Sequence, residues 1–511
     1  MMRAWRYRHW GVFAAVLVVV SACGVAIPPS SVVRLDAEPA GANCAEGGVA
    51  IRSGLDDDRN GVLDEGEVAS TEYICNGGDG VDGMDGTDGV AVRVSAAPWG
   101  GDCVHGGTRV DVGRDDDGDG VLGDDEVDET QYACNPYFVQ LAAGATGLDP
   151  LPNRGADATC SLVSDGSVRC WGANELGQLG DGTFRQQNTP SVVAGLAGFG
   201  AVAAVAAIAA GDRFACVLHT DGRVSCWGAN GSGQLGVGTT TTHRGTPAEV
   251  VGLAGVVELD VGGFHACART NAGTLSCWGH NSSGQLGDGT TGNRSAPVEV
   301  SGLADVTVVE VALGRVHSCA RLIDNTVRCW GHNGLGGLGN GTGMDSAVPV
   351  AVSGLTDVAE LALGYQHSCA RGTDGSVRCW GDNADGQVGV AIMTPSPLLA
   401  PMGAALASGA VALAAGGNTT CAVMGDGSAR CWGDNSGGQL ANGGAGPGMG
   451  IATPTVVPEL AGVAALTAGS YHVCALLMTG GAKCWGFNDT GQLGDGTVIT
   501  RTTPTPVRFG F

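Results

Sequence analysis

The stretch CWGHNSSGQLG, residues 277–287, decides the fold of this chain because it returns along the sequence. The pattern Trp-Gly-x-Asn-x-x-Gly-Gln-Leu-Gly recurs at 171–180 and 485–494, and in slightly degenerate form after Trp330 and Trp380. Successive copies lie 50 to 56 residues apart. A period of this length predicts a repeat architecture in which each copy is one supersecondary unit.

Each copy carries two cysteines ten positions apart, with a turn residue that tolerates positive φ just past their midpoint. A three-residue hairpin loop ending in this left-handed residue places the two cysteines opposite each other on adjacent antiparallel strands. Zinc ligation is the alternative, but an exported chain and nine-residue gaps disfavour it. The expected disulfides are Cys160–Cys170, Cys216–Cys226, Cys267–Cys277, Cys319–Cys329, Cys369–Cys379, Cys421–Cys431 and Cys474–Cys484, and the turn residues are Gly166, Gly222, Gly273, Asn325, Gly375, Gly427 and Gly480.

An apolar segment ending in glycine precedes each first cysteine, as in 308–314 and 358–364. The alanine-rich stretch 201–211 would read alone as a helix, but it aligns with these segments and is expected to be a strand. The chain has 90 glycines and few aromatic residues, which also favours a turn-rich protein. The sequence therefore predicts an all-β fold.

From about Tyr137 to Phe511 the chain resembles the regulator of chromosome condensation repeat family. The resemblance implies a seven-bladed β-propeller with one four-stranded sheet per repeat. We expect the terminal segment Thr505-Pro506-Val507 to pair with the first blade and close the ring. The family includes a nuclear exchange factor for a small GTPase and a bacterial inhibitor of β-lactamases. Export of this chain disfavours guanine-nucleotide exchange, and fold alone does not choose a function.

Four histidines stand two residues before a first cysteine, and a metal ring is one interpretation of them. Equivalent positions on different blades lie apart around the axis, so we expect structural hydrogen bonds instead. The seven tryptophans after the second cysteines are expected to pack between blades. Two departures from the repeat are candidate contact surfaces, namely the insertion 145–154 and the apolar segment 390–405. The histidines are His265, His317, His367 and His472.

Two acidic modules precede the repeats, and each is bracketed by cysteines 31 positions apart, predicting the disulfides Cys44–Cys75 and Cys103–Cys134. Each module contains the ligand spacing of an EF-hand loop in a strand context rather than between helices. We expect structural calcium of extracellular-type affinity, with a solvated acidic loop as the alternative. The expected ligands are Asp56, Asp58, Asn60, Val62, Asp64 and Glu67 in the first loop, and Asp115, Asp117, Asp119, Val121 and Glu126 in the second.

The N-terminus carries three arginines, an apolar run and small residues before Cys23, which indicate an export signal. Residues 20–23, Val-Ser-Ala-Cys, resemble the lipobox of bacterial lipoproteins, which implies a lipid on Cys23. An ordinary signal peptide is the alternative. The expected segments are a signal peptide at 1–22, an anchor and linker at 23–43, modules at 44–76 and 103–135, a Gly/Asp-rich linker at 77–102, and the propeller at 136–511.

The formal charge of −25, with Lys483 as the single lysine, argues against a nucleic-acid surface. No set of unique acid, base and nucleophile residues breaks the repeat, so we do not expect an enzyme. The favoured function is an exported, lipid-anchored scaffold in the bacterial envelope that binds an unknown protein or glycan. The alternatives are a secreted form, an extracellular hydrolase or lyase using the propeller channel, and an inhibitor of an extracellular enzyme.

Overall fold

The chain forms two compact units, one of residues Met1–Pro136 with Phe509–Phe511 and one of residues Tyr137–Arg508. The computed structural model describes six strands and residue 124 in the first unit, and residues 137–144, 157–196, 204–390, 399–401 and 405–508 in the second. Every described regular element is a β-strand, as the sequence predicts. The described residues include no helix that is long and apolar enough to cross a membrane.

The first unit contains two antiparallel sheets of three strands, in the orders β1-β2-β3 and β4-β5-β6. The two sheets have the same register, since Gly48 lies opposite Cys75 in one and Gly107 lies opposite Cys134 in the other. This matches the duplication seen in the sequence. The strands are β1 (Ser31–Glu38), β2 (Gly48–Leu55), β3 (Val68–Cys75), β4 (Gly89–Ala97), β5 (Gly107–Asp115) and β6 (Val127–Cys134).

The second sheet contains a buried carboxylate, Asp111, which is fully shielded from solvent. Arg93 Nη2 and Arg109 Nε each lie 2.8 Å from its oxygens, and Thr130 Oγ1 donates to it at 2.6 Å. Burial alone would raise the pKa of Asp111, but the hydrogen bonds from Thr130, Arg93 and Arg109 outweigh burial and lower it. The group is therefore a satisfied structural ion pair.

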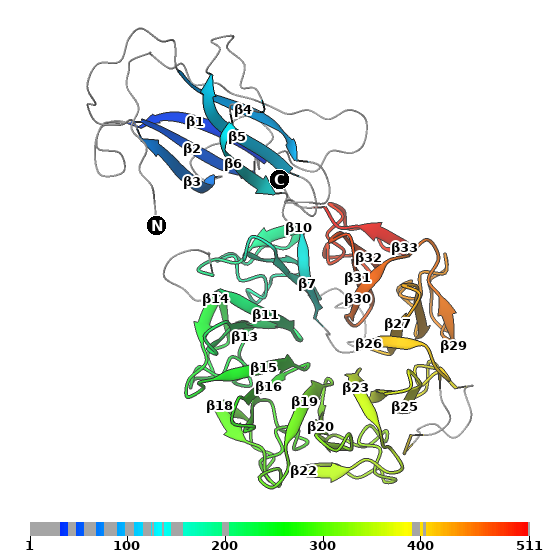
Figure 1. The fold of residues 1–511 in the computed structure, drawn as a ribbon. Helices are drawn as coiled ribbons and strands as arrows, with labels where there is room; N and C mark the ends of the chain where they lie inside the picture. Colours follow the sequence, from blue (N-terminus) through cyan, green and yellow to red (C-terminus); the bar gives the residue numbers. More distant parts are fainter. Residues whose placement is uncertain are drawn as a thin grey trace. The chain divides into compact units, whose positions relative to one another are not determined.

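The second unit is a propeller of seven antiparallel sheets around a central channel, as Figure 1 shows. Six sheets have four described strands and the fifth, β23-β24-β25, has three. The first strands, which line the channel, are β7 (Phe138–Ala143), β11 (Val205–Ala210), β15 (Val256–Val261), β19 (Val308–Leu313), β23 (Val358–Leu363), β26 (Ala410–Gly416) and β30 (Val463–Ala468). The alanine-rich segment is thus a strand, as expected.

The outer strands follow in chain order within each blade. The second strands are β8 (Ala158–Val163), β12 (Phe214–His219), β16 (His265–Thr270), β20 (His317–Leu322), β24 (His367–Gly372), β27 (Thr419–Met424) and β31 (His472–Leu477). The third strands are β9 (Val168–Gly172), β13 (Val224–Ala229), β17 (Leu275–Gly279), β21 (Val327–Gly331), β25 (Val377–Gly381), β28 (Ala429–Gly433) and β32 (Ala482–Gly486). The fourth strands are β10 (Gln187–Val192), β14 (His243–Glu249), β18 (Arg294–Glu299), β22 (Ser346–Ala351), β29 (Ile451–Val456) and β33 (Arg501–Pro506).

A disulfide joins the second and third strands of every blade, which confirms the seven predicted pairs. In the fourth blade, Cys319 lies directly opposite Cys329, with a Cα–Cα distance of 4.0 Å. The hairpin between them turns at Asn325, which has a φ of +61°, and the other six hairpins use a glycine with positive φ. The turn residues therefore set the register, and the register sets the disulfides.

The ring does not close through pairing of the last strand with the first blade. The last strand, β33, pairs with β32 of its own blade, so the prediction that residues 505–507 pair with the first blade is wrong. The first blade already has its fourth strand, β10, and needs no other. The first and last blades instead meet through single hydrogen bonds, such as Phe138 N to Gly480 O and Trp171 Nε1 to Gln492 O, both 3.0 Å.

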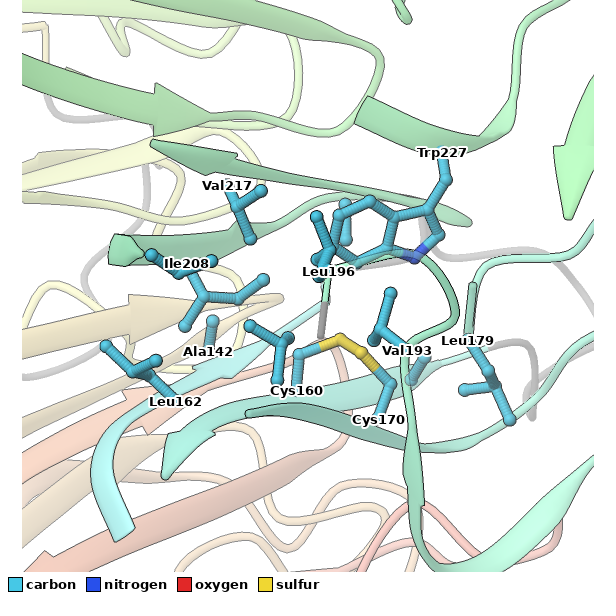
Figure 2. Packing of buried hydrophobic residues seen from close by; sticks show 14 residues of the cluster. Ala142, Cys160, Leu162, Cys170, Leu179, Val193, Leu196, Ile208, Val217 and Trp227 are labelled. Carbon is cyan, nitrogen blue, oxygen red and sulfur yellow. A yellow bond between two sulfur atoms is a disulfide. The ribbon is translucent and has the colours of Figure 1, made fainter. Parts of the chain in front are cut away.

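The core lies between neighbouring blades, as Figure 2 shows for the first and second. The Cys160–Cys170 disulfide and Leu162 of the first blade pack in one cluster with Val217 and Trp227 of the second. All seven repeat tryptophans are fully buried, and each indole donates to a backbone carbonyl of the preceding blade. This confirms their predicted packing role.

A side-chain clasp on the first strands ties several blades together. Glu310 Oε1 accepts a hydrogen bond from Leu361 N of the next blade at 2.9 Å, while its Oε2 accepts from Arg321 Nε at 2.6 Å. Glu258 and Glu360 make the same contacts in the third and fifth blades. The clasp fixes the spacing of the strands that line the channel.

The apolar segment 390–405 is only partly described. Gly341 N donates to Leu399 O at 2.9 Å and Ala405 N donates to Val377 O at 2.8 Å, contacts that fourth strands and their flanking residues make in other blades. The described ends of this segment therefore take the place of the fourth strand in the fifth blade. The insertion 145–154 lies outside the described residues.

Candidate binding face around the central channel

The loops between first and second strands, and those between third and fourth strands, lie at one end of the propeller, because antiparallel strands alternate in direction. We call this end the Arg315 face. The opposite end carries the hairpins between second and third strands, and we call it the hairpin face. The two faces differ in chemistry. The Arg315 face holds the groups that occur once, while the hairpin face repeats one kind of turn, which is Asp-Gly in four of the seven blades.

The four repeat histidines lie just below the Arg315 face, and all are fully buried. His265 Nε2 lies 2.8 Å from Ser318 Oγ of the next blade, and this hydroxyl donates to Gln285 O at 2.8 Å. Because the hydroxyl proton goes to the carbonyl, Nε2 must donate. The other three make equivalent contacts, His317 with Ser368, His367 with Thr420 and His472 with Thr159.

Burial, with no carboxylate against the ring, lowers the pKa of His265 and His367 to about 3. The glycine before each of these loops gives the ring its space, since a Cβ at Gly262 would lie 2.7 Å from Cε1 of His265. No three His, Cys, Asp or Glu residues gather to suit a metal ion within the described residues. The hydrogen bonds to the next blade give the histidines the structural role that the sequence predicts.

The central channel contains a cavity of about 260 Å³. Its wall is mostly the alanine, leucine and glycine residues of the first strands, such as Ala210, Leu313 and Ala415. Among the described residues, five with polar or charged side chains also line the cavity: Gln140, Asp260, Arg315, Tyr365 and Thr467.

Asp260 breaks the repeat at the fifth position of its strand, where most blades have alanine. Its Oδ2 accepts a hydrogen bond from Leu313 N of the next blade at 2.7 Å. Burial raises the pKa of Asp260 to about 7, because the amides of Val261 and Leu313 only partly compensate for lost solvation. The carboxyl therefore changes charge near neutral pH.

Arg315 reaches across the Arg315 face between two aromatic rings. Its guanidinium carbon lies 5.1 Å from the ring centre of Phe264 on the third blade and 4.6 Å from that of Tyr365 on the fifth. Nη1 also donates to the Tyr365 hydroxyl. The neighbouring loop makes room, because a Cβ at Gly263 would lie 2.5 Å from Arg315 Cγ. Two cation–π contacts therefore hold the guanidinium in one orientation.

His280 extends this cluster, with its ring centre 6.0 Å from that of Phe264. Its Nδ1 lies 2.9 Å from Gln285 Nε2, so Nδ1 accepts and the ring is neutral with its proton on Nε2. Burial, and then the charge of Arg315, lower the pKa of His280. The cluster of His280, Phe264, Arg315 and Tyr365 thus carries one positive charge at the channel mouth.

Most of the calcium ligands predicted from sequence lie outside the described residues, as do Cys23, Cys44 and Cys103. Of the predicted ligands in the second loop, only the backbone of Asp115, the last residue of β5, is described. Asp124 of this loop is described too, and its carboxylate pairs with Arg93 at 2.7 Å, but it is not one of the predicted ligands. The calcium sites, the lipid anchor and the two N-terminal disulfides therefore stay predictions. Conversely, sequence reasoning missed Asp260, Arg315 and their aromatic neighbours. An alignment of the seven repeats against one another would have shown them as single departures from the pattern.

The comparisons with known proteins fit this geometry. The regulator of chromosome condensation (RCC1) repeat model matches residues 205–234, 256–285, 308–336, 358–387, 410–439 and 463–492, and a second model of the repeat matches 165–218, 221–269, 272–321 and 324–371. Residues 30–75 and 91–134 match a domain of unknown function, DUF7151.

Among curated proteins, the Arabidopsis thaliana ultraviolet-B receptor UVR8 is 28% identical over 357 residues, which covers 68% of this chain and 79% of the receptor. The Mus musculus ligase HERC2 is 29% identical over 194 residues, which is 38% of this chain and 4% of HERC2. Homo sapiens HERC5 is 35% identical over 196 residues, 38% of this chain and 19% of HERC5. The chain thus spans less than a fifth of these ligases.

Solved structures share the fold, among them yeast RCC1 (Prp20) and human WBSCR16. Yeast RCC1 (Prp20), solved with Kap60, superposes with a TM-score of 0.60 at 23% identity, covering 67% of this chain and 83% of that one. Human WBSCR16 superposes with a TM-score of 0.57 at 22% identity, covering 67% of this chain and 94% of that one. At these identities the likeness establishes the fold alone.

Proposed function

Since residues Tyr137–Arg508 form a propeller of regulator of chromosome condensation repeats, we propose that this chain is an exported, membrane-anchored scaffold that binds a protein or glycan partner. One observation carries the proposal, the disulfide in every blade. Cytosolic thiol systems keep cysteines reduced, so seven structural disulfides indicate an oxidising compartment.

The anchor and the N-terminal unit complete the proposed arrangement. A lipid on Cys23 would hold the chain at a bacterial membrane, and calcium in the two acidic loops would stiffen the modules between membrane and propeller. An extracellular hydrolase, a lyase and an enzyme inhibitor stay as alternatives.

Expression of the full chain in a Gram-negative host tests export and anchoring. We expect the wild type in the membrane fraction with a lipid-dependent mass increase, and Cys23→Ser in the soluble envelope fraction with its propeller disulfides formed. Alkylation before and after reduction, read by mass spectrometry, counts those disulfides. Wild-type chain that stays in the cytosol with free propeller thiols would contradict the proposal.

A second experiment tests the binding face. The full chain is offered purified envelope proteins and a glycan array, and the affinity for the partner found is compared between two glutamate variants. Gln366→Glu adds a negative charge to the Arg315 face, while Ile323→Glu adds the same charge at a hairpin tip that is 68% exposed. We expect only Gln366→Glu to weaken binding, by about tenfold or more. Absence of any partner would refute the scaffold, and the reverse order of effects would refute the face.

A further inference from the structure

Arg315 lacks the carboxylate partner that other half-buried arginines near the channel have. Arg269, Arg321 and Arg371 each pair with a glutamate of the first strand of their own blade, at 2.6 to 2.8 Å. Arg315 has no carboxylate partner among the described residues, and its buried Nε has no hydrogen-bond partner there. A partly buried cation without a counter-ion is costly unless a ligand supplies one.

The guanidinium is also positioned before any ligand arrives. The rings of Phe264 and Tyr365 hold it on two sides, and the tyrosine hydroxyl takes one of its five N–H donors. The remaining donors keep the planar geometry that suits a carboxylate. Little side-chain entropy would be lost on binding, because the aromatic contacts already restrict the rotamer.

Below the guanidinium, the channel offers a space of limited size. The cavity of about 260 Å³ is lined by small and aliphatic residues from all seven first strands and the loops that follow them. A volume just below the usual range of small-molecule pockets suits a compact group rather than a drug-sized ligand. The site thus combines a cation at the mouth with small and aliphatic side chains beyond it.

We propose that this site binds a carboxylate carried by a compact aliphatic group, with Arg315 as the counter-ion and the channel wall around the aliphatic part. The proposal rests on the scaffold function and names the chemistry by which the propeller holds its ligand. Two sources supply such a group, the C-terminal end of a partner chain with aliphatic last residues, and a free short-chain acid.

The electrostatics of the channel are compatible with an anion. The net charge of −25 repels anions at long range, but physiological salt screens charges beyond roughly 8 Å. Asp260, the acidic group that lines the cavity, is mainly protonated below neutral pH and then does not repel the ligand. The charged groups acting on Asp260 are Glu258 on its own strand and Glu310 on β19, and β11 on the other side has no titratable side chain. Binding of a carboxylate should therefore weaken as pH rises through 7.

The test uses the full chain and three probes measured by titration calorimetry or ligand-observed NMR. The probes are the peptide acetyl-Ala-Leu-Leu with a free carboxylate, the same peptide with a C-terminal amide, and 4-methylpentanoate. We expect the free peptide to bind about tenfold or more tightly than the amide, since charge-assisted hydrogen bonds are lost. Comparable affinity of 4-methylpentanoate would assign the site to a free acid, and much weaker binding would assign it to a chain end.

Three variants separate the site from general effects. Arg315→Gln should weaken the free peptide about tenfold or more, while Arg378→Gln, the same change at an exposed arginine outside the channel, should not. Ala415→Leu should narrow the cavity and so abolish binding. The variant should still fold, because the fourth and fifth blades already have leucine at this position, Leu313 and Leu363. Asp260→Asn should remove the pH dependence.

The proposal is overturned if the amide binds as well as the acid, if Arg315→Gln and Arg378→Gln have equal effects, or if no probe binds the wild type. If Arg315→Gln does not fold, the binding of the free peptide to Ala415→Leu and of the amide peptide to the wild type still tests the site. A chain that captures a partner but binds no probe refutes this site and leaves the scaffold function standing. A chain that binds the free peptide but captures no macromolecule supports the site and refutes the scaffold function.

Discussion

Replacing Asp260 by asparagine should make the propeller more stable at pH 8 but not at pH 5. The folded protein raises the pKa of this carboxyl from 3.8 to about 7, chiefly by burial. An acid with a raised pKa in the folded state stabilises folding below its unfolded pKa and loses this contribution as pH rises through the folded pKa. Asparagine has no charge to lose, and its side-chain oxygen can still accept the hydrogen bond from Leu313 N.

The expected size follows from the shift in pKa. A shift of about three units corresponds to roughly 4 kcal/mol in the free energy of unfolding. Asp260 lines the channel and keeps partial contact with solvent, so we discount this value to about 2 kcal/mol. For a cooperative unit of roughly 370 residues, about 2 kcal/mol corresponds to a change in Tm of about 2 to 3 °C.

The assay is calorimetric unfolding of wild type and variant between pH 5 and pH 8.5 at constant ionic strength. We expect the difference in Tm to be near zero at pH 5 and to grow to about 2 to 3 °C by pH 8. Asp305→Asn removes the same charge from an exposed loop and should show one small offset at every pH. A Tm difference for Asp260→Asn that is independent of pH, or that favours wild type at pH 8, would show that burial does not control this carboxyl.

Other predictions concern the parts that repeat. Thr420→Val removes the acceptor of His367 Nε2 and should lower the free energy of unfolding by about 1 to 3 kcal/mol in urea titrations. Glu310→Ala removes the hydrogen bond to Leu361 N and leaves Arg321 without its partner, so a similar decrease in the free energy of unfolding is expected. An unchanged midpoint of urea unfolding would exclude a role for the clasp. Glu126→Gln should weaken calcium binding about tenfold or more by titration, and a wild-type chain that takes up no calcium would refute both loops. The Cys319–Cys329 disulfide should resist a water-soluble reductant in the folded chain, as read by alkylation, because both residues are fully buried.

The propeller could be predicted from sequence because its determinants are local. The turn residue Asn325 or its glycine equivalents, the cysteines at fixed spacing and the Trp-Gly pair lie within a few residues of one another in each copy. These fix the hairpin, its register and the buried face of the third strand. The way the ring closes could not be predicted from such local determinants. The last strand resembles every other fourth strand, and the blade with which it pairs depends on which blade lacks a fourth strand. The sequence of the last strand alone does not contain that information.

The candidate site could not be predicted in the same way, because its members come from three blades. Phe264, Arg315 and Tyr365 lie about 50 residues apart along the chain and meet only because the ring places neighbouring loops side by side. In a single repeat, Arg315 looks like an ordinary loop residue. Asp260 is similarly inconspicuous, because its raised pKa arises from the wall of the assembled channel.

The contrast between the histidines and Arg315 separates scaffold from site. Each repeat histidine has its Nε2 bonded to a hydroxyl of the next blade, so the ring geometry itself explains why the residue recurs. Arg315 occurs once, in a loop where the third blade has Gly263, and a side chain at Gly263 would collide with it. The glycine at position 263 therefore leaves the space that the Arg315 side chain occupies. A scaffold gains nothing from this pairing of a glycine with a charge that lacks a counter-ion, whereas a ligand site requires both the space and the charge.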